Sequence, residues 1–304
     1  MTTTDPSVFS AWIEAFRLRT LPLALSAIFM GSFLAVADGR YYAPVIGLAV
    51  LTTLFLQILS NLANDYGDLL KGTDNDNRVG PKRGVQSGLI SLRQIKSAII
   101  LFAMLSFVSG LGLLYVSLGN HFLTALLFLA LGLAAIAASI KYTAGNHAYG
   151  YRGLGDLFVF IFFGLVAVVG TYYLNSLQFH WLLLLPASAM GFLSAGVLNL
   201  NNMRDMDNDR ASGKHTIASR LGYGRARIYH TLLVIFALVS ASVYILLDFH
   251  SVWNLLFVLT IPLFVRDLIQ IFKIGNKALL DQFLKRLALS TLLFSLLFGV
   301  GICL

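Results

Sequence analysis

Two short clusters of carboxylates are the residues of this sequence most able to do chemistry. The first lies in NLANDYGDLLKGTDND, residues 61–76, and contains Asp65, Asp68, Asp74 and Asp76. The second is DMDND, residues 205–209, so the two clusters together hold half of the 14 acidic residues. Carboxylates that only faced one another would repel and would raise one another's pKa, so a cation is expected between them.

The ligand chemistry of the clusters indicates a hard cation. Carboxylate and amide oxygens, with no cysteine and no nearby pair of histidines, favour Mg²⁺, which we predict as the cofactor. Helical spacing places Asn61, Asn64 or Asp65, and Asp68 on one face, and it does the same for Asn202, Asp205 and Asp209. Asp207 is expected to point elsewhere. For either cluster alone, helix capping and solvated interfacial charge remain the alternative.

Basic side chains are interleaved with both clusters. They are Lys71, Arg78, Lys82 and Arg83 in the first, and Arg204, Arg210 and Lys214 in the second. Mg²⁺ usually takes only one or two protein carboxylates and leaves its other positions to water and substrate phosphates. Guanidinium and ammonium groups beside Mg²⁺ neutralise a diphosphate leaving group. A substrate diphosphate is therefore expected to bind together with Mg²⁺ between the clusters. Ordinary loop charge is the alternative for each basic residue taken singly.

The elements that must position these residues are membrane helices. Hydrophobic residues make up 58% of the chain and charged residues only 12%, which is typical of an integral membrane protein. Apolar runs near the ~20 residues that cross a bilayer predict an all-α protein with nine such helices. They lie at about 21–38, 43–63, 97–117, 122–140, 154–174, 181–200, 229–247, 251–271 and 287–304. We expect one polytopic domain over residues 1–304, preceded by an interfacial helix with Trp12 and Phe16 in the headgroups.

The basic residues also predict the orientation in the membrane. With nine helices, Arg40 is the exception among the 22 Lys and Arg residues, and the others fall on one side. The positive-inside rule then places the N-terminus and the loops 64–96, 141–153, 203–228 and 272–286 in the cytoplasm, as in an inner or plasma membrane protein. The net charge of +8 is therefore topological; it favours contact with anionic lipid and does not indicate nucleic acid. Cys303 is the single cysteine, which excludes an intramolecular disulfide.

A third polar segment, KYTAGNHAYGYRGLGD at residues 141–156, lies on the same side. Asp156 opens the predicted fifth helix and so carries a carboxylate to the depth of the membrane. An N-cap next to the helix macrodipole is the alternative role for this residue. His147, alone in the loop, is typical of a solvated side chain rather than a base.

Four segments resemble motifs of the UbiA superfamily of intramembrane prenyltransferases, and the similarity extends over nearly the whole chain. They are ILSNLANDYGD, GPKRGVQSG, YTAGNHAYGYRGLGD and VLNLNNMRDMDNDRASGKHT, in forms similar to the branch that acts on 1,4-dihydroxy-2-naphthoate. The resemblance implies about nine helices around a central apolar chamber with a polar cap on the cytoplasmic side. It implies Mg²⁺-dependent transfer of a polyprenyl group from polyprenyl diphosphate to this aromatic acid, with loss of CO₂, in menaquinone biosynthesis.

The resemblance also implies roles for individual residues. The implied metal ligands are Asn64, Asp65, Asp68, Asp74, Asp205 and Asp209, and the implied catalytic residues are Asp68, Asp156, Asp205 and Asp209. The implied substrate contacts are Asn64, Lys71, Arg83, Tyr142, Arg152, Asn202, Arg204 and Lys214. Two positions depart from the commonest pattern. Gly72 stands where most members have a further Asp, with Asp74 two residues later, and Asn146 stands where several relatives have Lys.

Other functions stay open at this point. A divalent-cation transporter would need acids near the bilayer midplane or on both faces, whereas the far side has only Asp38 and Asp248. A CDP-alcohol phosphotransferase would also use membrane aspartates and Mg²⁺, but its long signature is absent. Within the superfamily, 4-hydroxybenzoate, homogentisate or haem are alternative acceptors. The sequence does not indicate the donor chain length or the oligomeric state.

Overall fold

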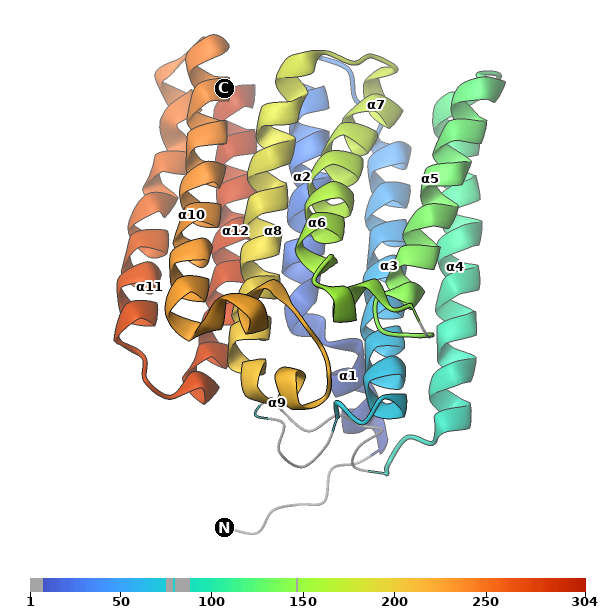
Figure 1. Ribbon diagram of the computed structural model, residues 1–304. Helices are drawn as coiled ribbons and strands as arrows, with labels where there is room; N and C mark the ends of the chain where they lie inside the picture. The colour runs from blue at the N-terminus through green and yellow to red at the C-terminus, as the bar shows by residue number, and fades with distance from the viewer. Residues whose placement is uncertain (1–7, 75–78, 80–87, 146) are drawn as a thin grey trace.

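The protein is a bundle of membrane-spanning helices. The computed structural model describes residues 8–74, 79, 88–145 and 147–304, and within these every regular element is a helix. Nine helical segments of this described part are long and apolar enough to cross a membrane. Figure 1 shows them side by side, with α1 and α9 at one end of the bundle and the C-terminus at the other. The predicted all-α membrane fold is confirmed.

The helices follow one another in the order that the apolar runs predict. The spans are α1 (Val8–Phe16), η1 (Leu18–Thr20) and α2 (Leu21–Ala37); α3 (Ala43–Leu70); α4 (Leu92–Leu118); α5 (Phe122–Lys141); α6 (Gly155–Val159), η3 (Phe160–Val169) and α7 (Gly170–Ser176); η4 (Trp181–Leu183) and α8 (Leu184–Arg204); α10 (Ile217–Leu247); η5 (Val252–Thr260) and α11 (Ile261–Lys273); and η6 (Lys277–Leu279) and α12 (Leu280–Cys303). Two short helices, η2 (Tyr149–Arg152) and α9 (Met206–Ala211), lie between spans.

The second span extends beyond its predicted end. The apolar run stops near residue 63, but α3 continues to Leu70, so the first acidic cluster begins on the helix rather than after it. Helix α3 ends where Gly72 adopts a φ of 70°, a left-handed conformation that glycine tolerates and that commonly terminates helices. The polar face of α3 is therefore rigid as far as Asp68.

Helix α1 packs against the protein rather than lying free in the headgroups. Trp12 and Phe16 belong to a cluster with Leu62 of α3 and Ile95 of α4, and the ring of Phe16 lies 5.5 Å from that of Phe102. These rings therefore have apolar partners on α3 and α4, and their place at the level of the headgroups stays a prediction. This packing fixes the link between α1 and α2 next to the polar end of α3.

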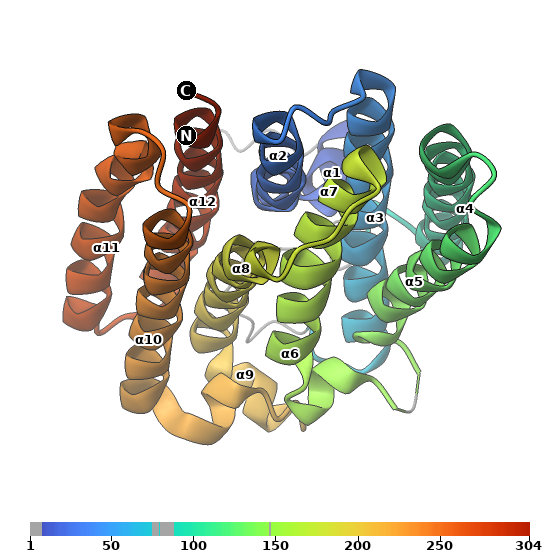
Figure 2. The same cartoon turned by 90° about the horizontal axis from the view of Figure 1, so that it is seen from above.

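The main core cluster contains residues of α8, α10, α11 and α12 with parts of α2 and the fifth span, whereas the chamber is lined by the first five spans. Viewed along the helices, α8 lies next to α6 and α10, with α4 and α5 at the far edge (Figure 2). Gly164 and Gly191 let the fifth and sixth spans touch, since a Cβ at Gly164 would lie 2.6 Å from the carbonyl oxygen of Ala187. A mostly apolar cavity of about 260 Å³ lies between α2, α3, α4, α5 and the fifth span. The predicted central chamber is confirmed.

Candidate functional site

The first acidic cluster is built on the last turns of α3 and the turn that follows. Asp65 and Asp68 are buried, with only 1% and 3% of their surfaces exposed. After Gly72 the chain folds back, so that the backbone N–H groups of Thr73 and Asp74 donate to the carbonyl oxygen of Asp68 at 2.9 and 3.3 Å. Asp74 is buried as well, which brings all three carboxylates to one end of the bundle.

The second cluster lies where α8 gives way to α9. The backbone at Asp205, with φ −94° and ψ 8°, departs from the helix, so the predicted regular spacing is interrupted there. The N–H of Asp209 still donates to the carbonyl oxygen of Asp205 at 2.8 Å, and both carboxylates are buried. Asp207 is exposed and forms an ion pair with Lys277 at 2.6 Å, which confirms the prediction that it points elsewhere.

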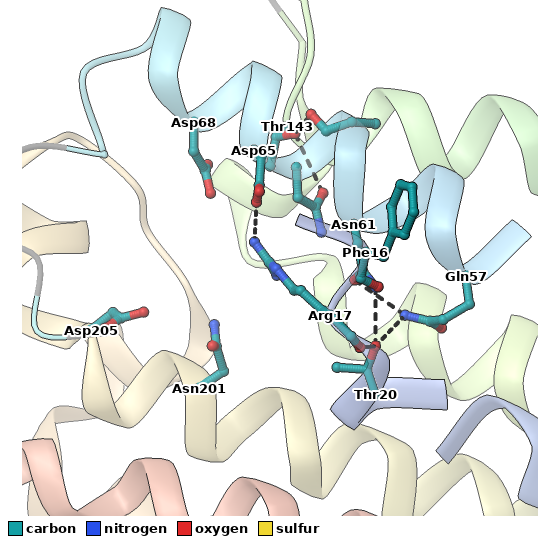
Figure 3. A network of polar contacts seen from close by, with 12 residues as sticks. Phe16, Arg17, Thr20, Gln57, Asn61, Asp65, Asp68, Thr143, Asn201 and Asp205 are labelled. Atoms are coloured by element: carbon teal, nitrogen blue, oxygen red, sulfur yellow. Dashed lines mark hydrogen bonds and ion pairs between the residues drawn. The ribbon is translucent and has the colours of Figure 1, made fainter. Parts of the chain in front are cut away.

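The fold brings the two clusters together. The amide of Asn208 on α9 donates to the carbonyl oxygen of Thr73 at 2.7 Å. The Nζ of Lys214 lies 3.9 Å from Oδ1 of Asp68 and 3.5 Å from Oδ1 of Asp209, so one ammonium group lies between the motifs. Figure 3 shows Asp65 and Asp68 on one side and Asp205 on the other. Sequence reasoning predicted both clusters and Lys214, and the structure places them in one site.

Tyr151 is a site residue that sequence reasoning missed. Its hydroxyl donates to Oδ1 of Asp68 at 2.9 Å and lies 2.6 Å from the Thr73 hydroxyl. The Nζ of Lys71 lies 3.9 Å from the centre of the Tyr151 ring, a cation–π contact. Burial, followed by the charge of Asp68, raises the pKa of Tyr151, so the phenol stays a proton donor. Its loop was recognised from the sequence, but no spacing rule relates this loop to α3.

The link between α1 and α2 is a second feature that was missed. Arg17 has a left-handed backbone with φ 49° and forms an ion pair with Asp65. The Asn61 amide donates to the carbonyl oxygen of Phe16 at 2.9 Å and to the Thr20 hydroxyl at 3.1 Å. Figure 3 shows this network fastening the link to the polar face of α3. From the sequence, Arg17 counted only among the basic residues that predict the orientation in the membrane.

Two arginines predicted to contact substrate have protein partners in this structure, and their contact with substrate stays a prediction. Arg204 is 1% exposed, and it holds both carboxylate oxygens of Asp205 through Nε at 2.9 Å and Nη2 at 2.6 Å. Its Nη1 contacts Asp281. Arg152 is exposed, its guanidinium contacts His147, and it is not part of the chamber wall. Of these partners, Asp281 is distant in the sequence and comes near Arg204 only in the fold. The predicted contact Arg83 lies outside the described residues, as do Asp76, Arg78, Lys82 and Asn146.

The remaining predicted residues lie around the inner end of the site. Asp156 is buried in the first turn of α6 and accepts a hydrogen bond from the Tyr229 hydroxyl at 3.3 Å, so it is not the N-cap. Burial, with Asp156 and Asp68 as the nearest charges, raises the pKa of Tyr142. Oδ1 of Asn64 lies 3.4 Å from the Thr143 hydroxyl. Tyr142 packs closely against the start of α6, where a Cβ at Gly155 would lie 3.0 Å from Cε2 of its ring.

The donor groups of the site fit a hard cation, although the basic side chains now neutralise most of its acids. In the part of the chain that the structure describes, no three Asp, Glu, His or Cys side chains are grouped closely enough to hold a metal. Oδ1 of Asn202 and Oδ2 of Asp209 are nevertheless buried and accept no hydrogen bond from the described residues. Burial raises the pKa of Asp209 to about 6 despite the opposing charge of Lys214. A nearby cation would favour the ionised form of this carboxyl.

Fold and site together define a multi-pass membrane protein with a charged site at one end of an apolar chamber. Residues 24–299 match the sequence profile of the UbiA prenyltransferase family. The chain therefore belongs to the UbiA prenyltransferase family, as the resemblance of its motifs predicted.

Individual relatives support the same assignment. The chain is 43% identical to a 1,4-dihydroxy-2-naphthoate octaprenyltransferase of Escherichia coli over 303 residues, which cover 99% of this chain and 98% of the relative. A protein of that name from Mycobacterium tuberculosis is 39% identical over 75% of each chain. Among solved structures, an apo UbiA homolog from Aeropyrum pernix has a TM-score of 0.70 at 18% identity, covering 94% of this chain and 98% of its own. A homolog from Archaeoglobus fulgidus bound to DMAPP and Mg²⁺ has a TM-score of 0.60 at 18% identity, with 97% and 99% covered.

Proposed function

We propose that this protein transfers a polyprenyl group from polyprenyl diphosphate to 1,4-dihydroxy-2-naphthoate, with loss of CO₂, in menaquinone biosynthesis. One observation carries the proposal: α3 lines the apolar chamber through Gln57 and Ser60 and carries Asp65 and Asp68 roughly two turns further on. A donor with a diphosphate head and a hydrocarbon tail needs both environments on one wall. The names of the relatives at 43% and 39% identity support the aromatic acceptor.

The side chains divide the work between the two ends of this donor. Mg²⁺, when bound, supplies positive charge that stabilises the departing diphosphate. We propose Asn64, Asp65, Asp68, Asp74, Asp205 and Asp209 as its ligands. Lys71 and Lys214, which now contact Tyr151 and the motif carboxylates, are available to bind the diphosphate oxygens.

Tyr151 and the chamber prepare the site for an allylic cation. The Tyr151 hydroxyl orients the Asp68 carboxylate by donating to Oδ1. The apolar chamber excludes water, which would otherwise capture the cation before the electron-rich ring of the acceptor does. Asp156 and Tyr142 lie near the same end, where the acceptor must meet the reacting carbon. No side chain needs to act as a covalent nucleophile in this scheme.

The test of the proposed function is an assay of the purified protein in lipid nanodiscs. Farnesyl or a longer prenyl diphosphate is supplied with Mg²⁺ and with 1,4-dihydroxy-2-naphthoate, 4-hydroxybenzoate or homogentisate in separate reactions. We expect the naphthoate to give the highest kcat/KM. A higher kcat/KM with 4-hydroxybenzoate would show that the acceptor is wrong, even if the diphosphate site is right.

We also propose that the site end of this single polytopic domain faces the cytoplasm of a cell whose inner or plasma membrane holds the protein. Support comes from the bias of basic residues toward that end. In a Cys303→Ser background, Arg225→Cys is therefore expected to resist labelling by an impermeant maleimide in intact cells. The exposed Trp181 lies at the opposite end, so Trp181→Cys should be labelled. The reverse pattern would contradict this orientation.

A further inference from the structure

Asp281, in the first turn of α12, links the two ends of the chain to the second acidic cluster. One of its oxygens, Oδ2, accepts from Nη1 of Arg19 at 2.9 Å, and the other contacts Nη1 of Arg204. Arg204 in turn holds Asp205. Positive and negative groups therefore alternate from Arg19 through Asp281 and Arg204 to Asp205, across η1, α12 and α8.

Arg204 is locked by these contacts. Its side chain is 1% exposed, and Nε and Nη2 grip the two oxygens of Asp205 while Nη2 also lies 2.8 Å from Oδ1 of Asn201. The remaining nitrogen, Nη1, is taken by Asp281. A buried guanidinium is stable only when its donors are satisfied, and planar two-point contacts fix its orientation. Asp281 thus completes the set of partners that holds Arg204 in place.

The orientation of Arg204 sets that of the Asp205 carboxylate. Each carboxylate oxygen can accept more than one interaction, so an oxygen held by Arg204 keeps capacity for a metal ion. Groups that hydrogen-bond to a metal ligand fix the orientation of its side chain and its charge. Their loss commonly weakens metal binding by about 10–100-fold. Asp281 contacts Arg204, which in turn holds the ligand Asp205.

We propose that Asp281 is a positioning residue for the metal ligand Asp205, acting through Arg204 with Arg19 as the outer partner. The assignment rests on the proposed function, which makes Asp205 a Mg²⁺ ligand. Without the charge of Asp281, Arg19 loses the ion pair that the structure shows for it, and Arg204 keeps Asp205 as its ion-pair partner among the described residues. Arg204 then draws more strongly on Asp205 and adds uncompensated positive charge beside the metal, so metal affinity falls.

The same short link also reaches the first cluster. Arg17, two residues before Arg19, forms its ion pair with Asp65 directly. The link between α1 and α2 therefore contacts one acidic motif through Arg17 and the other through Arg19, Asp281 and Arg204. Replacing Arg19 should therefore shift metal binding in the opposite direction to replacing Asp281, and by a smaller factor, because it removes an outer positive charge and leaves Asp281 to compensate Arg204.

The experiment measures two quantities on the purified protein. The first is the Kd for Mn²⁺ in the presence of inorganic diphosphate, determined by electron paramagnetic resonance, and the second is the Mg²⁺ concentration for half-maximal activity. We expect Asp281→Asn to raise both by about tenfold, to leave the acceptor KM unchanged, and to be partly rescued by Asp281→Glu. Arg19→Gln should lower both by a smaller factor, and the Arg19→Gln and Asp281→Asn double variant should lose less affinity than Asp281→Asn alone.

Asp267→Asn is the matched control. Asp267 of α11 pairs with Arg266 at 3.0 Å and with Arg286 at 3.6 Å, and it contacts neither acidic motif in these ion pairs. Its replacement should leave Mn²⁺ binding unchanged.

Unaltered Mn²⁺ affinity in Asp281→Asn, beside an active wild type, would overturn the positioning role. Equal losses of Mn²⁺ affinity and of thermal stability in both variants would also overturn it. A wild type that binds no Mn²⁺ and transfers no prenyl group would instead overturn the proposed function, and this assignment with it.

Discussion

The Asp68→Asn variant is expected to lose about a thousandfold or more in kcat while its helices remain folded. The amide has the size of the carboxylate and can still accept the hydrogen bond from Tyr151, so packing around this buried side chain is kept. The negative charge, however, is lost at the point where two motifs and Lys214 converge. Without it the site cannot hold Mg²⁺ against the diphosphate, so the leaving group is no longer stabilised. Asp205→Asn should act in the same direction.

The second acidic motif supplies a matched control for this prediction. Asp207 lies between Asp205 and Asp209 in the sequence, but its side chain is 74% exposed and pairs with Lys277. Asp207→Asn should therefore keep near-wild-type kcat and metal dependence. Activity is followed as prenylated product at saturating Mg²⁺, with circular dichroism to check that the helices persist. Full turnover by Asp68→Asn, or by the wild type in excess chelator, would be incompatible with a metal-dependent site.

The spans were predictable because the bilayer imposes a length and a composition on each of them. Every predicted apolar run coincides with an observed span, yet several ends were misplaced. Helix α3 continues to Leu70, and α10 begins at Ile217, well before the predicted residue 229. On α3 the polar side chains Asp65 and Asp68 are buried against other protein groups. On α10 the chain breaks at Gly222, with φ 76°, between the polar first turn and the rest of the helix. Hydropathy predicts only the part of a helix that must be apolar to cross the bilayer. It does not predict how far the helix continues beyond the apolar run.

The site was predictable where its residues share an element and not where they meet across elements. Helical periodicity relates Asn61, Asp65 and Asp68 because they follow one another on α3. Helical periodicity does not predict Tyr151, which lies 83 residues further along the chain and whose hydroxyl donates to Asp68. The contact of Arg204 with Asp281 was missed for the same reason, since Asp281 lies 77 residues away. Such pairings depend on how the helices pack, which one sequence does not display.

The basic residues of the site explain how it holds so much buried acid before a metal binds. Arg17 contacts Asp65, Arg204 contacts Asp205, and Lys214 lies between Asp68 and Asp209. Each carboxylate is compensated, because unpaired buried charge is strongly destabilising. The compensating groups differ in mobility, since Arg204 is locked by Asp281 whereas Lys214 has a flexible stem. We expect Lys214, rather than Arg204, to move onto the diphosphate oxygens when Mg²⁺ binds.

Carboxyl-labelled 1,4-dihydroxy-2-naphthoate is expected to release one labelled CO₂ for each prenyl group transferred. As the C–O bond of the donor breaks, its electron pair leaves with the diphosphate, and the ring supplies the pair that forms the new C–C bond. The bond to the carboxylate then breaks and returns its pair to the ring, which restores aromaticity without any oxidant. An acceptor that keeps its carboxylate, such as 4-hydroxybenzoate, must instead lose a proton from the ring.

The surroundings of the acceptor favour this outcome. A carboxylate held in the mostly apolar chamber is poorly solvated, whereas neutral CO₂ has no such cost, so loss of the charge is favoured there. Trapped CO₂ and prenylated product are counted in the same reaction, with omission of the donor as the control for spontaneous decarboxylation. Omission should abolish the label in CO₂, since the carboxyl bond breaks only after the prenyl group has joined the ring. Label that stayed on the prenylated product would exclude the naphthoate reaction and leave a prenyltransferase with a different acceptor chemistry on the same diphosphate site.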